Sequence, residues 1–237
     1  MKNPANADLA KLDLACQKAH GFIASVQPVD ESPLDSPDVI ARMAKAAQNA
    51  GAFAIRIQGE LNVKAAIDFG LSVPVIGIIK RDLEDSPVRI TPFLEDVEAL
   101  ARAGAKIVAI DATNRQRPVA LSKLIKRALE LDLLVMSDCS SLEDALIASE
   151  LGAHIAGSTL SGYTGDITPK EPDFALVKAM SEQGLRVVAE GRFNTPPLAR
   201  QALEHGAWAV TIGTALTRLE VVCSWFIDEM RQASAKL

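Results

Sequence analysis

The sequence predicts an α/β fold, a (β/α)8 TIM barrel formed by a single domain over residues 1–237. Three observations lead to this prediction. Apolar segments of strand length alternate with amphipathic segments of helix length eight times along the chain. Several of the helical segments end in glycine directly before a strand, as in NAG (49–51) and ARAG (101–104). The last two strands also end in glycine, where such barrels bind phosphate.

In the first half of the chain, helical segments alternate with apolar runs. Residues 1–20 are expected to form a short N-terminal helical extension ahead of the run GFIASVQ (21–27). The segment 38–51 carries apolar residues at helical spacing and ends at Gly51, which predicts a helix closed by a glycine cap. By the same criteria we expect strand 52–58, helix 62–70, strand 73–82, helix 93–104 and strand 106–113.

The second half repeats the pattern, with a longer polar loop over 161–172. The strands are short runs of Val, Ile and Ala, typical of a parallel sheet covered by helices. An open doubly wound sheet is the structural alternative, but no GxGxxG motif opens the first helix. The expected elements are helix 118–131, strand 133–139, helix 142–152, strand 153–159, helix 173–184, strand 186–191, helix 196–206, strand 207–213 and helix 219–230.

Composition excludes several classes of protein. The formal net charge is -5 and no dense run of Lys or Arg occurs, so we expect no nucleic-acid partner. No apolar segment reaches signal-peptide or membrane-spanning length, so we expect a cytoplasmic protein without membrane contact. The three cysteines are scattered without CxxC spacing, and the three histidines stand apart. With no Rossmann, Walker A or HExxH motif either, we expect no metal and no cofactor.

Polar residues cluster where the predicted strands end, which is where barrel enzymes place their active sites. Lys80 and Glu190 stand out, because a lysine at a barrel mouth can act as a base once burial or a neighbouring cation lowers its pKa. A structural ion pair between Lys80 and Glu190 is the alternative interpretation. The complete set is Gln27, Arg56, Gln58, Lys80, Asp82, Asp111, Thr113, Asp138, Thr159, Glu190 and Arg192.

The two carboxy-terminal glycine loops predict a phosphate site. Backbone N–H groups around Gly191 and Arg192 in one loop, and Gly213 and Thr214 in the other, can approach a phosphate closely, with Arg218 nearby. Tight packing between helix and strand would also explain each glycine singly. We therefore expect a small phosphorylated substrate.

Six segments of the chain share one resemblance: IRIQG (55–59), VPVIGIIKRD (73–82), DATNRQRP (111–118), STLSGYT (158–164), AEGRFNTP (189–196) and IGTALTR (212–218). They resemble one family, the N-acylglucosamine-6-phosphate 2-epimerases, also called N-acetylmannosamine-6-phosphate epimerases. The resemblance runs in order from about Ser25 to Arg218. It implies cofactor-independent interconversion of N-acetylmannosamine 6-phosphate and N-acetylglucosamine 6-phosphate in sialic acid breakdown.

The resemblance also implies roles for individual residues. Its catalytic lysine matches Lys80 and its catalytic glutamate matches Glu190. Where the family usually has Ser-Cys-Gln on the first strand, this chain has Ser25-Val26-Gln27 and keeps the glutamine. Its substrate-binding residues match Gln27, Arg56, Asp138 and Arg218.

Three other functions stay open at this stage. Another phosphosugar epimerase or isomerase would share the phosphate loops, usually with a metal or a different acid–base pair. A noncatalytic phosphosugar-binding barrel would bind without turnover. A metal-dependent aldolase would form a Schiff base on Lys80.

The last predicted helix carries more apolar residues than one face requires. Trp225 and Phe226 lie among Val221, Val222 and Ile227. We expect most of this surface to pack against the barrel, and a homodimer as the alternative use of it.

Overall fold

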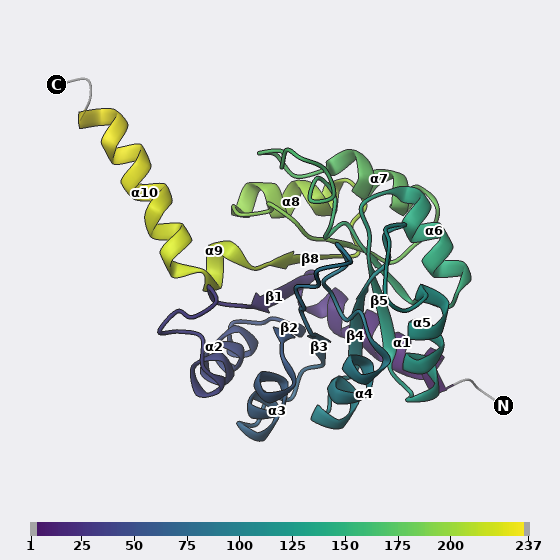
Figure 1. Ribbon diagram of the computed structural model, residues 1–237. Helices are drawn as coiled ribbons and strands as arrows, with labels where there is room; N and C mark the ends of the chain where they lie inside the picture. Colours follow the sequence, from purple (N-terminus) through teal and green to yellow (C-terminus); the bar gives the residue numbers. More distant parts are fainter. Residues whose placement is uncertain (1–3, 235–237) are drawn as a thin grey trace.

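The computed structural model describes residues 4–234 and forms a closed barrel of parallel strands (Figure 1). Each strand pairs with the next along the chain, and β8 pairs with β1 to close the sheet. The predicted (β/α)8 barrel is therefore confirmed. The strands are β1 (Phe22–Val26), β2 (Ala54–Gln58), β3 (Val75–Ile78), β4 (Ile107–Asp111), β5 (Leu134–Asp138), β6 (Ile155–Gly157), β7 (Val187–Ala189) and β8 (Ala209–Ile212).

Seven helices alternate with the strands and cover the outside of the barrel (Figure 1). They are α2 (Pro37–Asn49), α3 (Glu60–Asp68), α4 (Leu94–Ala103), α5 (Leu121–Glu130), α6 (Leu142–Glu150), α7 (Phe174–Glu182) and α8 (Pro196–Glu204). Their apolar faces pack on outward-pointing strand residues such as Ile55, Val108 and Val135. No helix within residues 4–234 is both long and apolar enough to cross a membrane.

The inward-pointing residues form a separate core. Side chains alternate between the two faces of a strand, so every second residue points into the barrel. The interior is filled by apolar side chains near the amino ends of the strands, including Ile23, Ile76, Met136 and Val188.

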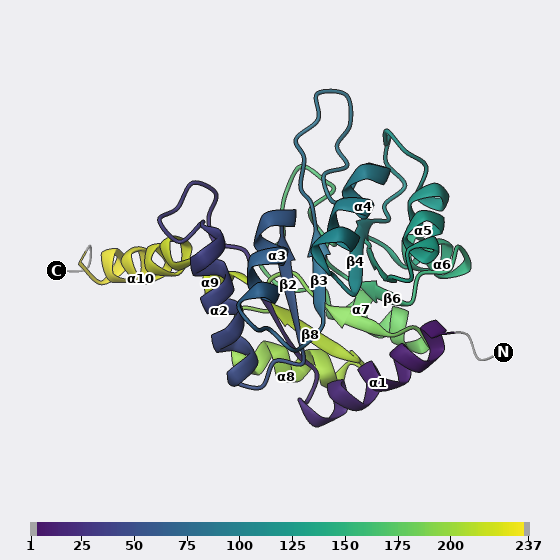
Figure 2. The same cartoon turned by 90° about the horizontal axis from the view of Figure 1, so that it is seen from below.

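The first helix, α1 (Pro4–Lys18), covers the amino-terminal end of the barrel (Figure 2). Leu9, Leu12 and Cys16 recur on one face of the helix and are buried against the inner core. This is the predicted extension over residues 1–20, whose first three residues lie outside the described part of the chain. With that end covered, the opposite end is the open one.

After β8 the chain forms a short helix, α9 (Thr214–Thr217), which the sequence did not predict, and then α10 (Leu219–Ser234). Both views show α10 pointing away from the barrel (Figures 1 and 2). Phe226 is 68% exposed and Ile227 is 48% exposed. The expectation that this apolar surface packs against the barrel is therefore wrong. The helix leaves the barrel at the α9 turn, which ends at Arg218.

Candidate active site

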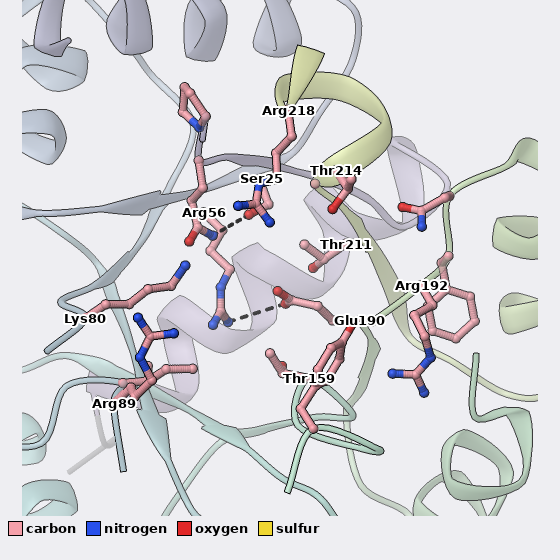
Figure 3. A pocket seen from close by; sticks show the side chains of 18 of the residues that line it. Ser25, Arg56, Lys80, Arg89, Thr159, Glu190, Arg192, Thr211, Thr214 and Arg218 are labelled. Atoms are coloured by element: carbon pink, nitrogen blue, oxygen red, sulfur yellow. Dashed lines mark hydrogen bonds and ion pairs between the residues drawn. The ribbon is translucent and has the colours of Figure 1, made fainter. Parts of the chain in front are cut away.

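A cavity of about 310 Å³ opens at the carboxyl ends of the strands (Figure 3). Its volume suits a small ligand. Its lining comes from several strand ends and from the loops that follow them: Ser25, Gln27, Pro28, Asp30, Arg56, Lys80, Arg89, Ile90, Thr159, Tyr163, Glu190, Gly191, Arg192, Phe193, Asn194, Thr211, Gly213, Thr214 and Arg218.

The alternation of side chains along the strands explains how distant residues meet here. On β3, Ile76 and Ile78 point into the barrel, so Lys80 two positions later enters the cavity. On β7, Val188 points inward and Glu190 follows in the same register. The same spacing places Thr211 of β8 at the cavity wall.

Arg56 of β2 forms the floor of the cavity and is 1% exposed. Its Nη1 and Nη2 donate to the two carboxylate oxygens of Asp138 at 3.0 and 2.6 Å, and Nη1 lies 3.4 Å from Oε2 of Glu190. The hydroxyl of Thr159 donates to the same Asp138 carboxylate at 2.6 Å. Burial opposes the charge of Arg56, but Asp138 and Glu190 outweigh it and hold its pKa above the ordinary value. Arg56 therefore stays a fixed cation beneath the cavity.

Glu190 shares this one cation with Asp138. Burial, together with the negative charge of Asp138, raises the pKa of Glu190 to about 7, against the attraction of Arg56 and Lys80. Near neutral pH the carboxyl group of Glu190 therefore exists in both protonation states. This is the condition for a group that both gives and takes a proton.

Lys80 enters the cavity from another side than Glu190 (Figure 3). Burial, together with the positive charge of Arg56, lowers the pKa of Lys80 to about 8. An isolated antiparallel β-bridge pairs the backbones of Lys80 and Ile90 and folds the loop between them back. Arg89 therefore lies at the cavity beside the lysine. Within residues 4–234, no ion pair joins Lys80 to Glu190, which pairs with Arg56 instead. The structural ion pair considered from sequence is therefore not formed.

The two glycine loops lie at one end of the cavity. Gly191 has a φ of 105° and Arg192 a φ of 67°, a left-handed conformation that is uncommon for a residue with a side chain. A Cβ on Gly213 would lie 3.2 Å from that of Ser25, a tight contact, so the glycine lets the β8 loop pack closely against β1. The hydroxyl of Thr217 donates to the carbonyl of Ser25 at 3.1 Å and holds α9 in place. Residues of both loops line the cavity.

Several buried polar atoms at the cavity have no hydrogen-bond partner in the described part of the chain. They are Oε1 of Gln27, Nε of Arg56, Oγ1 of Thr211 and Nε of Arg218. Buried polar atoms are normally hydrogen-bonded. Because these atoms surround one cavity, they indicate a polar ligand with several oxygen or nitrogen atoms.

Most of the residues predicted from sequence line the cavity: Gln27, Arg56, Lys80, Thr159, Glu190, Gly191, Arg192, Gly213, Thr214 and Arg218. Asp138 does not line it, because it is fully buried beneath Arg56. Gln58, Asp82, Asp111 and Thr113 do not line it either. Asp111 instead accepts hydrogen bonds from Thr113 and Arg115, which fixes the loop after β4.

Sequence reasoning missed Arg89, Tyr163 and Thr211. Thr211 could have been found from its inward register two residues after Ala209. Arg89 and Tyr163 are brought in by loops, which carry no such periodicity. Between residues 4 and 234, no group of three or more His, Cys, Asp or Glu side chains is placed to hold a metal ion.

Comparison with known proteins identifies the family. Residues 40–232 match the family model described as "Putative N-acetylmannosamine-6-phosphate epimerase". A relative from Salmonella paratyphi A, named "Putative N-acetylmannosamine-6-phosphate 2-epimerase 2", is 55% identical over 96% of this chain and 99% of its own. A relative from Escherichia coli O9:H4, with the same name but no final number, is 57% identical over 95% of this chain and 98% of its own.

A solved structure gives the same result. The N-acetylmannosamine-6-phosphate 2-epimerase from Clostridium perfringens is 34% identical, with a TM-score of 0.85, and the match covers 91% of this chain and 95% of that one. Both the sequence and the barrel match over nearly the full length. The chain therefore belongs to the N-acetylmannosamine-6-phosphate epimerase family.

Proposed function

We propose that the protein interconverts N-acetylmannosamine 6-phosphate and N-acetylglucosamine 6-phosphate by removing and returning the proton on C2, without a cofactor. The observation that carries the proposal is the placement of Lys80 and Glu190, which enter one cavity from different sides (Figure 3). The names of the relatives support the substrate pair.

The proton transfers follow from the chemistry of an open-chain 2-acetamido sugar. Its C2 lies beside the C1 aldehyde, so loss of the C2 proton gives an enolate. Neutral Lys80 takes the proton from one face, and protonated Glu190 returns a proton to the other face, which inverts the centre. The buried charge of Arg56 stabilises the negative charge that develops on the enolate oxygen. In the reverse direction the two residues exchange roles.

Phosphate binding orients the sugar for this reaction. We assign it to the backbone N–H groups around Gly191, Arg192, Gly213 and Thr214, with the side chain of Arg218 as counter-ion. The unpartnered atoms of Gln27 and Thr211 are available to the sugar hydroxyls. Asp138 acts through Arg56, whose guanidinium it holds at two points.

The pH dependence of turnover tests the pairing of Lys80 with Glu190. In each direction of the reaction, one of the two groups must be protonated and the other deprotonated. Below about pH 7 both groups are protonated and no base is present, and above about pH 8 both are deprotonated and no acid is present. We expect a bell-shaped profile of kcat/KM with limbs near these values, the same in both directions. If kcat/KM stayed constant from well below pH 7 to well above pH 8, the result would argue against this pair of groups.

Removal of the 6-phosphate is expected to lower kcat/KM severely. The phosphate holds the sugar in the two glycine loops, and this binding positions C2 between Lys80 and Glu190. The loss should be about 10²-fold or more when unphosphorylated N-acetylmannosamine replaces the 6-phosphate. Steady-state kinetics with the two sugars measures it, and comparable kcat/KM values would contradict the assignment of the phosphate site.

The function itself is tested by incubating the protein with N-acetylmannosamine 6-phosphate and following the products by NMR. Appearance of N-acetylglucosamine 6-phosphate is the expected result. Binding without turnover would instead favour a phosphosugar-binding protein. Borohydride trapping of substrate on the protein would favour Schiff-base chemistry on Lys80.

We also propose that two copies associate through α10, in a protein of one domain that works in the cytoplasm. The free cysteines Cys16, Cys139 and Cys223 suit a reducing compartment. On α10, Trp225 and Phe226 are exposed on a helix that projects from the barrel. Within residues 4–234, no helix covers the barrel between α8 and α2 (Figure 1), and we place the α10 of a second copy at this position.

Phe226→Glu is expected to give a monomer, because it places a charge in the apolar surface of α10. Light scattering after size exclusion should show twice 25.2 kDa for the unchanged protein and a single subunit for the variant. Ser224→Glu adds the same charge on the polar side of the helix and is the matched control, expected to remain dimeric. A monomeric parent protein would refute the proposal.

A further inference from the structure

The loop between β6 and α7 borders the cavity at Tyr163, and side-chain hydrogen bonds hold its two ends. At Ser161, the buried hydroxyl donates to the carboxylate of Asp173 at 2.6 Å. The same carboxylate caps α7 by accepting from the N–H of Leu176 at 2.8 Å. The residues between these points are mostly exposed, and Ile167 is 85% exposed. A further contact, from a neighbouring loop, joins the two ends.

That contact comes from Arg192, in the neighbouring loop between β7 and α8. Its Nε donates to the carbonyl of Glu171 and its Nη1 to the carbonyl of Ser161, both at 2.8 Å. Its guanidinium also lies 5.0 Å from the centre of the Tyr163 ring. One side chain thus holds the loop near both of its ends and at the tyrosine.

The tyrosine held in this way covers the phosphate end of the cavity. Tyr163 and Gly191 both line the cavity, and a Cβ on Gly191 would lie 3.6 Å from Cε2 of Tyr163. The ring therefore packs directly on the glycine backbone that we assign to phosphate binding. Tyr163 is 45% exposed, and the part of its ring that contacts Gly191 shields this stretch of backbone from water, which strengthens its hydrogen bonds to an anion.

We propose that the Arg192 guanidinium is a positioning group: it straps the β6–α7 loop onto the phosphate loop and so holds Tyr163 over the phosphate of the substrate. This inference rests on the proposed function and adds a residue role to it. Arg192 has two separable parts. Its backbone N–H lies in the phosphate loop, while its side chain is directed to the carbonyls of another loop and not to the anion.

Two substitutions at Arg192 separate the strap from the other possibilities. Arg192→Lys keeps the positive charge but loses the planar fork that reaches two carbonyls and stacks on an aromatic ring. Arg192→Gly removes the side chain while suiting the left-handed backbone at this position. If the side chain served only as a charge for phosphate, lysine would substitute for it. If the residue served only to shape the backbone, glycine would substitute for arginine.

If the Arg192 side chain holds the loop, neither lysine nor glycine can replace it. Hydrogen–deuterium exchange over residues 162–171 should become about tenfold faster or more in each variant, without change in α6. For the 6-phosphate substrate, kcat/KM should fall by about 10- to 100-fold in each, because the cavity wall is displaced. Arg200→Lys, at an exposed ion pair on α8, is the matched control and should leave both measurements unchanged.

Removing the ring tests the same contact from the other loop. Tyr163→Phe keeps the ring, and its kcat/KM should equal that of the parent protein. Tyr163→Ala removes the ring, and its kcat/KM should fall as far as that of Arg192→Gly. Combining Tyr163→Ala with Arg192→Gly should add little further loss, since both break one arrangement.

Exchange over 162–171 that stays at the parent rate in Arg192→Gly would overturn the strap. Normal kcat/KM despite faster exchange would overturn its role in the reaction. If the parent protein shows no turnover at all, the proposed function fails, and the exchange measurements still decide whether Arg192 holds the loop.

Discussion

Replacing Lys80 with alanine is expected to lower kcat for epimerisation by about 10²- to 10⁴-fold, the usual effect of losing a positioned base. KM should change little, because the phosphate loops lie at another part of the cavity and remain intact. Steady-state kinetics in both directions measures the effect. Lys64→Ala, which removes an exposed lysine on α3, is the control and should behave as the parent protein.

Lys80→Arg makes the test more specific. Arginine keeps the positive charge at this position but stays protonated at any pH the protein tolerates, so it cannot take the C2 proton. We expect it to be as inactive as the alanine variant. Substantial activity in Lys80→Arg would mean that the lysine acts as a charge and not as a base.

Replacing Arg56 with methionine is expected to impair both folding and catalysis. The substitution leaves the buried carboxylate of Asp138 without its counter-ion, which typically lowers the free energy of unfolding by about 3–5 kcal/mol. It also removes the charge beneath the enolate, for which a loss of about 10²-fold or more in kcat is expected. Chemical denaturation and steady-state kinetics measure the two effects.

The double variant Arg56→Met with Asp138→Leu separates them. Replacing the whole buried pair by apolar side chains of similar size should restore much of the stability. Activity should remain low, because the cation is still missing. Recovery of activity together with stability would show that Arg56 only supports the fold, and would contradict its assignment to the enolate.

The barrel could be predicted from the sequence because its elements follow local rules. Helices ending in glycine and short apolar strands recur, and the structure has them within a few residues of the predicted ranges. The site residues at strand ends could be predicted from the sequence in the same way. Once Ile76 and Ile78 are inside the barrel, Lys80 must point to its mouth.

What the sequence did not reveal depends on tertiary contacts. Asp138 occupies a strand end like the others, but only the structure shows it fully buried beneath Arg56. The direction of α10 is set by the short turn at α9, and no helical periodicity encodes it. Arg89 and Tyr163 reach the cavity through folded-back loops, whose course depends on contacts such as those of Arg192.

The exchange of the C2 hydrogen with deuterated solvent tests the central claim most directly, since that claim places Lys80 and Glu190 on different sides of C2. NMR in D2O should show the parent protein introducing deuterium at C2 during epimerisation. For Glu190→Gln, exchange should continue in the epimer whose C2–H faces Lys80, with little inversion. For Lys80→Ala, exchange in that same epimer should stop along with epimerisation. A folded Lys80→Ala protein that binds this epimer and still exchanges its C2 hydrogen at the parent rate would contradict the account.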